Sequence, residues 1–255
     1  MALQYRTKGL IFNKKDRMES DRIFSAFTED FGKIEVVGKA IRKISSKLKQ
    51  NIEMFSLSEI EFVQGKNRKT LTDAVISRKF KSLSSDPDKF EIANRISKII
   101  DEFIKGEEKD ESIWNFITDI FKKLDDCNFK SHKYYIVYYY FLWNFVSVLG
   151  HKPEIYNCSL CGQKLNPYGI YFSNKNGGTI CKSCNNLEES GVKVKSDTIK
   201  ILRLILNREW QTLLKIKTED FLKSSLKDIS SSYYSYLLSV YGSDLRQTNQ
   251  TDIIR

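Results

Sequence analysis

The chain has 255 residues and carries 42 Lys and Arg against 32 Asp and Glu, a formal net charge of +10 at pH 7. Hydrophobic residues make up 41% of it, with only three prolines and twelve glycines, which excludes a disordered or fibrous protein. The longest apolar run, Tyr134–Leu149, is shorter than the roughly 20 residues that a membrane-spanning helix needs. No secretion signal is visible at the start. We therefore expect a soluble cytoplasmic protein with no membrane partner.

The positive charge is concentrated in the first third of the sequence. Residues 1–81 hold 18 Lys and Arg against 10 Asp and Glu, an excess of 8, whereas the rest hold 24 against 22, an excess of 2. This asymmetry predicts a basic N-terminal domain on a nearly neutral body. Concentrated basic charge favours a polyanionic partner, with nucleic acid first and a membrane surface second, and solubility as the alternative.

Residues 1–81 have the pattern of short β-strands separated by Gly, Asn, Asp and Ser breakers. The candidate strands, each with β-branched or alternating apolar residues, are Thr7–Phe12, Lys33–Gly38, Ser56–Val63 and Leu71–Arg78. This spacing suits a small closed or nearly closed β-barrel.

After Asp86 the hydrophobic period becomes helical. Candidate helices cover Ile92–Ile104, Ile113–Leu124, Tyr134–Leu149, the segment from Ser196 to Leu206, Thr218–Leu226 and Ile229–Tyr241. A Cys-rich insert of about residues 156–190 interrupts them. The sequence therefore predicts an α+β multidomain protein, with a barrel over residues 1–81 and a helical domain over residues 82–255.

Four of the five cysteines form two C-x-x-C pairs, Cys158 with Cys161 and Cys181 with Cys184. Nineteen residues separate the pairs, which is the spacing of a four-cysteine zinc site. Four sulfur ligands close the coordination shell, so we expect one structural zinc ion and no catalytic metal. Gly162 after the first pair and the turn at 176–178 favour two knuckles joined by a hairpin. Cys127 stands alone and is expected to be a buried small hydrophobe.

Two basic strings stand out in the predicted barrel, and their spaced cations could follow a phosphate backbone. The candidate DNA-binding residues are Lys14, Lys15 and Arg17 in the first string and Lys39, Arg42, Lys43, Lys47 and Lys49 in the second. A solvated loop is the alternative for either string. Five phenylalanines of the same region could supply base-stacking platforms, although each is more often a core residue, namely Phe12, Phe24, Phe27, Phe31 and Phe55.

No catalytic motif is found: the sequence has no phosphate-binding glycine loop, dinucleotide fingerprint, nucleophile elbow or metalloprotease motif. An enzyme built on the C-x-x-C pairs, a zinc-dependent hydrolase or a thiol oxidoreductase, would need an open metal position or a low-pKa thiol. No general base supports it. We therefore expect a binding protein and no catalytic residues.

Several segments, in order, resemble the family of the bacterial recombination mediator RecO, a DNA repair protein. The segments that carry the resemblance are T-K-G-L-I-F at Thr7–Phe12, Met18–Ile34, the basic Gly38–Lys47, F-V-S-V-L-G-H-K-P at Phe145–Pro153, C-S-L-C-G from Cys158 and G-G-T-I-C-K-S-C ending at Cys184. The ordered set covers roughly residues 5–240. No single short motif in it is specific.

The resemblance implies an N-terminal OB-fold, a helical domain and a four-cysteine zinc finger. It also implies binding of single- and double-stranded DNA and ATP-independent annealing of complementary strands. With RecR, such proteins help load RecA onto DNA coated with single-strand binding protein (SSB), and they bind the SSB C-terminal tail. The zinc ligands carry over to Cys158, Cys161, Cys181 and Cys184. DNA contacts carry over only loosely, to Arg42, Lys43 and Lys47.

We therefore expect a nucleoid-associated, cytoplasmic DNA-binding recombination mediator that is monomeric on its own. A zinc-ribbon module that binds RNA or the transcription machinery is the alternative, because the charge asymmetry fits it equally well. The order of the family segments is what favours the mediator.

Overall fold

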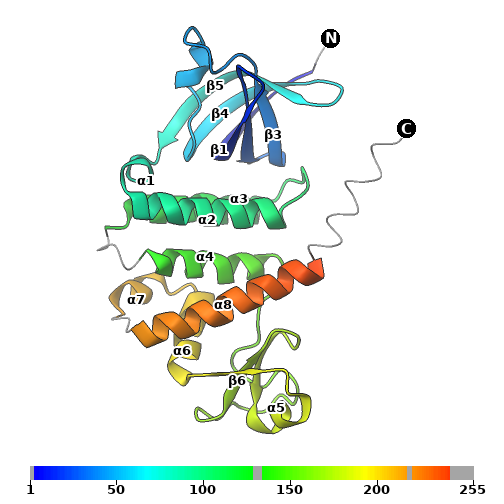
Figure 1. The fold of residues 1–255 in the computed structure, drawn as a ribbon, viewed down its shortest axis with the longest axis vertical. Coiled ribbons are helices and arrows are strands. Elements are labelled where there is room, and N and C mark those ends of the chain that lie inside the picture. Colours follow the sequence, from blue (N-terminus) through cyan, green and yellow to red (C-terminus); the bar gives the residue numbers. More distant parts are fainter. Residues whose placement is uncertain (1–2, 129–133, 217–219, 242–255) are drawn as a thin grey trace. The chain divides into compact units, whose positions relative to one another are not determined.

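The computed structural model describes residues 3–128, 134–216 and 220–241 (Figure 1). It divides into two compact units, residues 1–137 and 138–255, which are described separately. Among the described residues, none of the helices combines the length and apolarity that crossing a membrane requires.

The first unit begins with a closed five-stranded β-barrel in the order β1-β2-β3-β5-β4. Its strands are β1 (Gln4–Arg17), β2 (Asp21–Thr28), β3 (Gly32–Gly38), β4 (Ser56–Gln64) and β5 (Lys69–Lys79). A short 3-10 helix, η1 (Lys47–Gln50), lies between β3 and β4. All neighbouring pairs are antiparallel except β3 with β5, which is parallel.

Strand pairing shows how strongly the barrel is staggered. Following paired residues once around the sheet leads from Gln4 to Val63, Thr70, Val37 and Ile23, and back to β1 at Lys15. The sheet therefore closes on β1 eleven residues farther along, which is 15 minus 4. β1 pairs with β4 over Gln4–Ile11 and with β2 over Gly9–Arg17, and a register shift between Ile11 and Asn13 marks a bulge that bends it.

The inner face of the barrel forms one apolar core. Its buried members are Ile11, Phe24, Ala26, Ile34, Val36, Ile41, Ile52, Ile60, Phe62, Leu71 and Ala74. Ile41 and Ile52 come from the segment between β3 and β4, so this segment contributes to the core of the barrel. Three helices, α1 (Lys81–Ser85), α2 (Pro87–Phe103) and α3 (Glu111–Asp126), follow β5.

Both long helices of this unit begin at an aspartate. The Asp86 carboxylate accepts hydrogen bonds from the Asp88 and Lys89 backbone N–H groups at 2.9 and 3.2 Å, and Pro87 takes the first helical position. Asp110 accepts from the Ile113 N–H at 2.9 Å in the same way. A side-chain oxygen at this position satisfies a backbone donor that has no partner inside the helix, which explains where α2 and α3 start.

Helix α4 (Tyr135–Val148) continues from the first unit into the second. In the second unit, a three-stranded sheet in the order β7-β6-β8 is built from β6 (Ile170–Ser173), β7 (Gly178–Cys181) and β8 (Val192–Val194). The helices are α5 (Lys182–Glu188), α6 (Ser196–Leu206), α7 (Trp210–Lys215) and α8 (Asp220–Tyr241).

Buried polar contacts hold α4, α6 and α8 together in the second unit. The Trp143 indole N–H donates to Ser230 Oγ at 2.9 Å, and its ring stacks on Tyr233 with centroids 5.1 Å apart. The Asn144 amide donates to the Ile205 carbonyl at 2.9 Å. These bonds satisfy the polar atoms that the aromatic helix brings into the core.

The predicted mixture of an N-terminal sheet domain and a helical domain is confirmed. All four candidate strands and the first four candidate helices are present, but the strands β2 and β8 and the short helices η1, α1, α5 and α7 were missed. Thr218–Leu226 and Ile229–Tyr241 are not two helices within the described residues, because α8 runs unbroken from Asp220 to Tyr241. Thr218 and Glu219 lie outside the described residues.

Candidate nucleic-acid interface and metal centre

The two basic strings predicted from the sequence lie against each other at one end of the barrel. The first is the β1–β2 hairpin and the second is the segment of residues 39–49 that follows β3. The Ala40 N–H donates to the Asp21 carboxylate at 2.8 Å, and the Arg42 N–H donates to the Ser20 carbonyl at 3.0 Å. These bonds join the segment to the hairpin, so strings separated by more than twenty residues form one surface, which we call the basic face.

The cations of the basic face are mostly free of acidic partners. Lys14, Lys15, Lys39, Arg42, Lys43, Lys47 and Lys49 are exposed, and Arg17 is half-buried. Within the described ranges, Arg42 is the one member of these eight that lies within 4 Å of a carboxylate. Seven cations therefore present uncompensated charge to solvent, which is what a polyanion requires of its binding surface.

Asp16 joins two arginines at the edge of the basic face. Its carboxylate lies 2.7 Å from Arg22 Nε and 3.6 Å from Arg42 Nε. The hydrogen bond from Arg22 lowers the pKa of Asp16 below its ordinary value, so the carboxylate is ionised at neutral pH. Asp16 thus holds two guanidinium groups close together and neutralises part of their charge.

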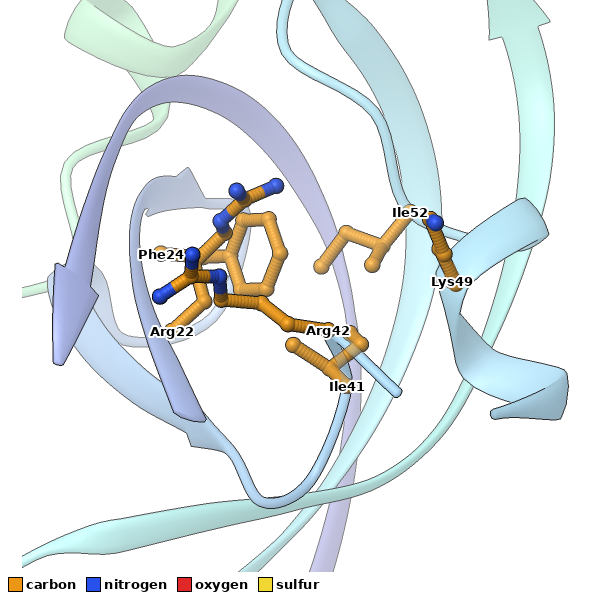
Figure 2. Close-up of a pocket in the computed structure, with 6 residues that line it drawn as sticks. All are labelled: Arg22, Phe24, Ile41, Arg42, Lys49 and Ile52. Carbon is orange, nitrogen blue, oxygen red and sulfur yellow. The ribbon is translucent and has the colours of Figure 1, made fainter. Parts of the chain in front are cut away.

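A small pocket of about 130 Å³ opens beside these arginines. Figure 2 shows its lining, in which the Arg22 and Arg42 guanidinium groups lie near the Phe24 ring. Lys49 from η1 and the core residues Ile41 and Ile52 complete it. Its volume is below the roughly 300 Å³ of pockets that enclose whole small molecules. It can therefore take a single charged or planar group. Arg22 was not among the predicted DNA-binding residues, although it stands near the first string.

The phenylalanines considered as stacking platforms are core residues instead. Phe12, Phe24, Phe27 and Phe55 are at most 2% exposed, and the half-buried Phe31 packs against the barrel core. Phe31 also meets the Phe62 ring edge-on at 5.6 Å between centroids. The stacking hypothesis is therefore wrong for these five, because their rings are used in packing. Phe24 fills the barrel interior, whereas Phe27 and Phe55 pack against aromatic rings of α2 and α3.

The four paired cysteines meet at one point of the second unit. Their Sγ atoms all lie within 4.8 Å of one another, and Cys161 and Cys181 are 3.9 Å apart. A tetrahedral zinc ion with Zn–S bonds of 2.3 Å places its sulfurs roughly 3.8 Å apart. The thiol cluster therefore fits a metal ion of that size. Cys127, in the first unit, is buried, as predicted, and burial raises its pKa to about 11.

The backbone prepares the cluster for ionised sulfur. Gly162 adopts a left-handed φ of +72°, and its N–H donates to the Cys158 carbonyl at 2.9 Å, which closes the first knuckle. Burial of Cys158 opposes ionisation, but the backbone N–H groups of Cys161, Cys181 and Leu160 outweigh it and lower its pKa to about 6. The sulfur that faces these donors is the one that most readily becomes a thiolate ligand.

The second knuckle is fixed by a close backbone approach. The β6–β7 hairpin predicted at this place is present, with the Gly177 N–H donating to the Asn174 carbonyl at 3.1 Å. Gly178 pairs with Glu154 so closely that a Cβ on it would lie 2.2 Å from the Glu154 carbonyl oxygen. Glycine is therefore required here for the chain to bring Cys181 to the first knuckle.

A closed basic barrel followed by helices and a four-thiol cluster defines this protein as a small multidomain protein with a basic face and a cysteine cluster that fits a metal ion. The family model described as "Recombination protein O N terminal" matches residues 1–80, and "Recombination protein O C terminal" matches residues 84–242. The chain therefore belongs to the Recombination protein O (RecO) family.

Curated relatives match along nearly their whole length. The DNA repair protein RecO of Dehalococcoides mccartyi (strain ATCC BAA-2266 / KCTC 15142 / 195) is 28% identical over 223 residues, which cover 88% of this chain and 86% of the relative. The DNA repair protein RecO of Thermoanaerobacter sp. (strain X514) is 25% identical over 235 residues, covering 92% and 93%. The family resemblance drawn from the sequence is thereby confirmed.

Proposed function

We propose that this protein is a DNA-binding recombination mediator in DNA repair that works without catalysing a chemical step. The observation that carries the proposal is the basic face, where seven cations without an acidic partner among the described residues come together on two adjoining segments. Membership of the RecO family supports DNA as the polyanion.

Single-strand annealing follows from such a surface. Two complementary strands repel each other through their phosphates, and a dense cationic face neutralises both backbones while leaving the base edges free to pair. Arg22, Arg42 and Lys49 around the pocket would hold one phosphate more firmly than the open surface does. Annealing of this kind needs no ATP, because pairing of the bases supplies the free energy.

We further propose that the barrel is an OB-fold, with a domain boundary near residue 81, and that the protein meets RecR and the SSB C-terminal tail in loading RecA. The strand order β1-β2-β3-β5-β4 and the match of the N-terminal family model to residues 1–80 support the first part. The second part rests on the family alone. A cytoplasmic, nucleoid-associated monomer is the form we expect to act.

Zinc is the metal we propose for the thiol cluster. Cys158, Cys161, Cys181 and Cys184 would complete a tetrahedral shell with no position left for water, so the ion would be structural. Bound there, it would link the segment before β6 to the β7–α5 turn, in addition to the backbone hydrogen bonds between Glu154 or Ser159 and Thr179.

The test is ATP-free annealing of two complementary DNA strands, naked and coated with the cognate SSB. Annealing of both is the expected result and would also show contact with the coating protein. Annealing of naked strands alone would keep DNA binding and remove the SSB contact. Failure with both, together with preferential binding of RNA, would favour the zinc-ribbon alternative.

A further inference from the structure

Two large apolar side chains stand exposed among the cations of the basic face. Ile44 is 100% exposed and Met18 is 76% exposed, and both lie in the segments that form this face. Among residues 3–80, no aromatic side chain is exposed, and the other large exposed apolar residues are Leu3 and Val75. A fully exposed isoleucine contributes no buried area to the fold, and here two exposed apolar side chains lie on the same charged face.

The backbone holds these two segments together. The Arg42 guanidinium reaches the Met18 carbonyl at 3.5 Å, in addition to the bond from its N–H to Ser20 at 3.0 Å. Met18 has a φ of +50° and Ala40 a φ of +52°, a region that side-chain-bearing residues seldom occupy. Such strain persists only where the surroundings fix it, and here it presents Met18 at the tip of the hairpin.

The neighbouring charges define what can cover these side chains. Ile44 follows Lys43 and precedes Lys47 by three residues, and Met18 follows Arg17, so a partner of Ile44 or Met18 must also accept several cations. Nucleic acid satisfies both demands, because its phosphates carry the charge and its base steps offer apolar faces. Isoleucine and methionine are among the side chains that proteins insert between base steps.

We propose that Ile44 and Met18 are apolar wedges that contact unstacked bases of DNA bound on the basic face. The proposal rests on the proposed function, since it requires DNA at this surface, and it adds a contact to the bases that the cations do not make. Insertion disturbs stacking least where bases are already unpaired. The wedges therefore favour single strands and mismatched steps over regular duplex, and they keep the bases separated and ready to pair.

The test uses the full chain and DNA strands carrying 2-aminopurine, whose fluorescence rises when the base loses its stacking neighbours. The variants are Ile44→Ser, Met18→Ser and the double variant, with Leu3→Ser as the matched control, because Leu3 is 68% exposed but lies outside the basic face. Because the wedges are exposed, these changes leave the fold intact, which circular dichroism verifies.

The wild type and the control are expected to raise 2-aminopurine fluorescence on binding. The double variant is expected to lose that rise and to bind single strands about tenfold or more weakly, the effect of leaving these side chains uncovered. Its salt dependence should be unchanged, because the phosphate contacts remain. Ile44→Met should keep most of the fluorescence rise, because methionine is also an apolar side chain that can insert between bases.

An unchanged fluorescence rise and affinity in the double variant would overturn the wedges while leaving the proposed function standing. Failure of the wild type to bind DNA at all would instead overturn the proposed function. Sedimentation with vesicles containing an acidic phospholipid gives a third outcome. If the double variant loses vesicle binding but keeps the DNA fluorescence rise, the apolar side chains insert into a membrane and the proposal is wrong.

Discussion

The unpaired cations of the basic face predict how steeply DNA binding weakens with salt. Each phosphate neutralised on a single strand contributes about −0.7 to the slope of log affinity against log salt. With seven unpaired cations in contact, the expected slope is about −5. Removing three of them by Lys43→Ala, Lys47→Ala and Lys49→Ala together should reduce the slope to about −3.

The difference is large enough to measure. A change in slope of about 2 means that the ratio of wild-type to variant affinity falls about sixteenfold between 50 and 200 mM salt. Fluorescence anisotropy of a labelled single strand over that range gives both slopes. All three lysines are exposed and make no ion pair in the described residues, so their removal has little effect on stability.

A matched control separates a local surface from net charge. Lys122→Ala, Lys164→Ala and Lys193→Ala together remove the same charge from exposed lysines outside the barrel, and none of these has a carboxylate within 4 Å among the described residues. This control should keep the slope of the wild type. If both triple variants lose the same slope, or if the first loses none, DNA does not bind on the basic face and the reasoning is refuted.

Four further outcomes are expected. Asp16→Asn should strengthen DNA binding severalfold in anisotropy titrations, because it frees Arg22 and Arg42 from a carboxylate, and weaker binding would mean that Asp16 mainly positions them. Cys161→Ser should lower bound zinc from one ion per chain by metal analysis and expose residues 156–190 to protease while DNA binding persists, whereas full zinc occupancy would refute the four-sulfur site. Gly178→Ala should lower the free energy of unfolding by more than about 1 kcal/mol, and by more than Gly177→Ala, whose Cβ would meet no atom within 4 Å. Asp86→Ala should cost about 1 kcal/mol in denaturant unfolding through loss of the helix cap. Burial raises the pKa of Asp86, but hydrogen bonds from the Lys89 N–H and the Tyr134 hydroxyl lower it overall, so this stabilisation is present above about pH 4 and should disappear as pH falls through the lowered pKa. A stability loss that does not depend on pH would contradict this account.

Residue patterns predicted the long helices, including the almost wholly buried α4, and most of the strands, but they missed strand β2, which is buried on both faces. Strand β2 was missed because its residues show no alternation. Phe24 points into the barrel core, while Phe27, on the opposite face of the strand, stacks against Trp114 of α3 with ring centroids 6.4 Å apart. A helix covers the outside of the barrel at this strand. The sequence of an eight-residue strand cannot predict contact with a helix that begins about eighty residues later.

The metal cluster was predictable from spacing alone because its chemistry is local to two knuckles. The burial of the phenylalanines could not be predicted in the same way, since the composition of a segment does not tell whether an aromatic ring is buried or lies on the surface. Nor does it show that Asp16, read as part of a basic string, sits between Arg22 and Arg42. That contact depends on the register of β1 with β2, in which Asp16 lies opposite Arg22.

The arrangement of charge also favours a binding surface over simple solubility. Many cations elsewhere in the first unit are paired with acids, among them Arg6 with Glu59, Lys33 with Asp101 and Lys79 with Glu53. Residues 39–49 instead hold five cations and no acid. Solubility needs only net charge, which dispersed ion-paired surfaces with a few spare lysines provide. Concentrating unpaired cations on adjoining segments adds mutual repulsion, and a polyanion that neutralises them removes it. The repulsion between these cations therefore lies where bound DNA would offset it.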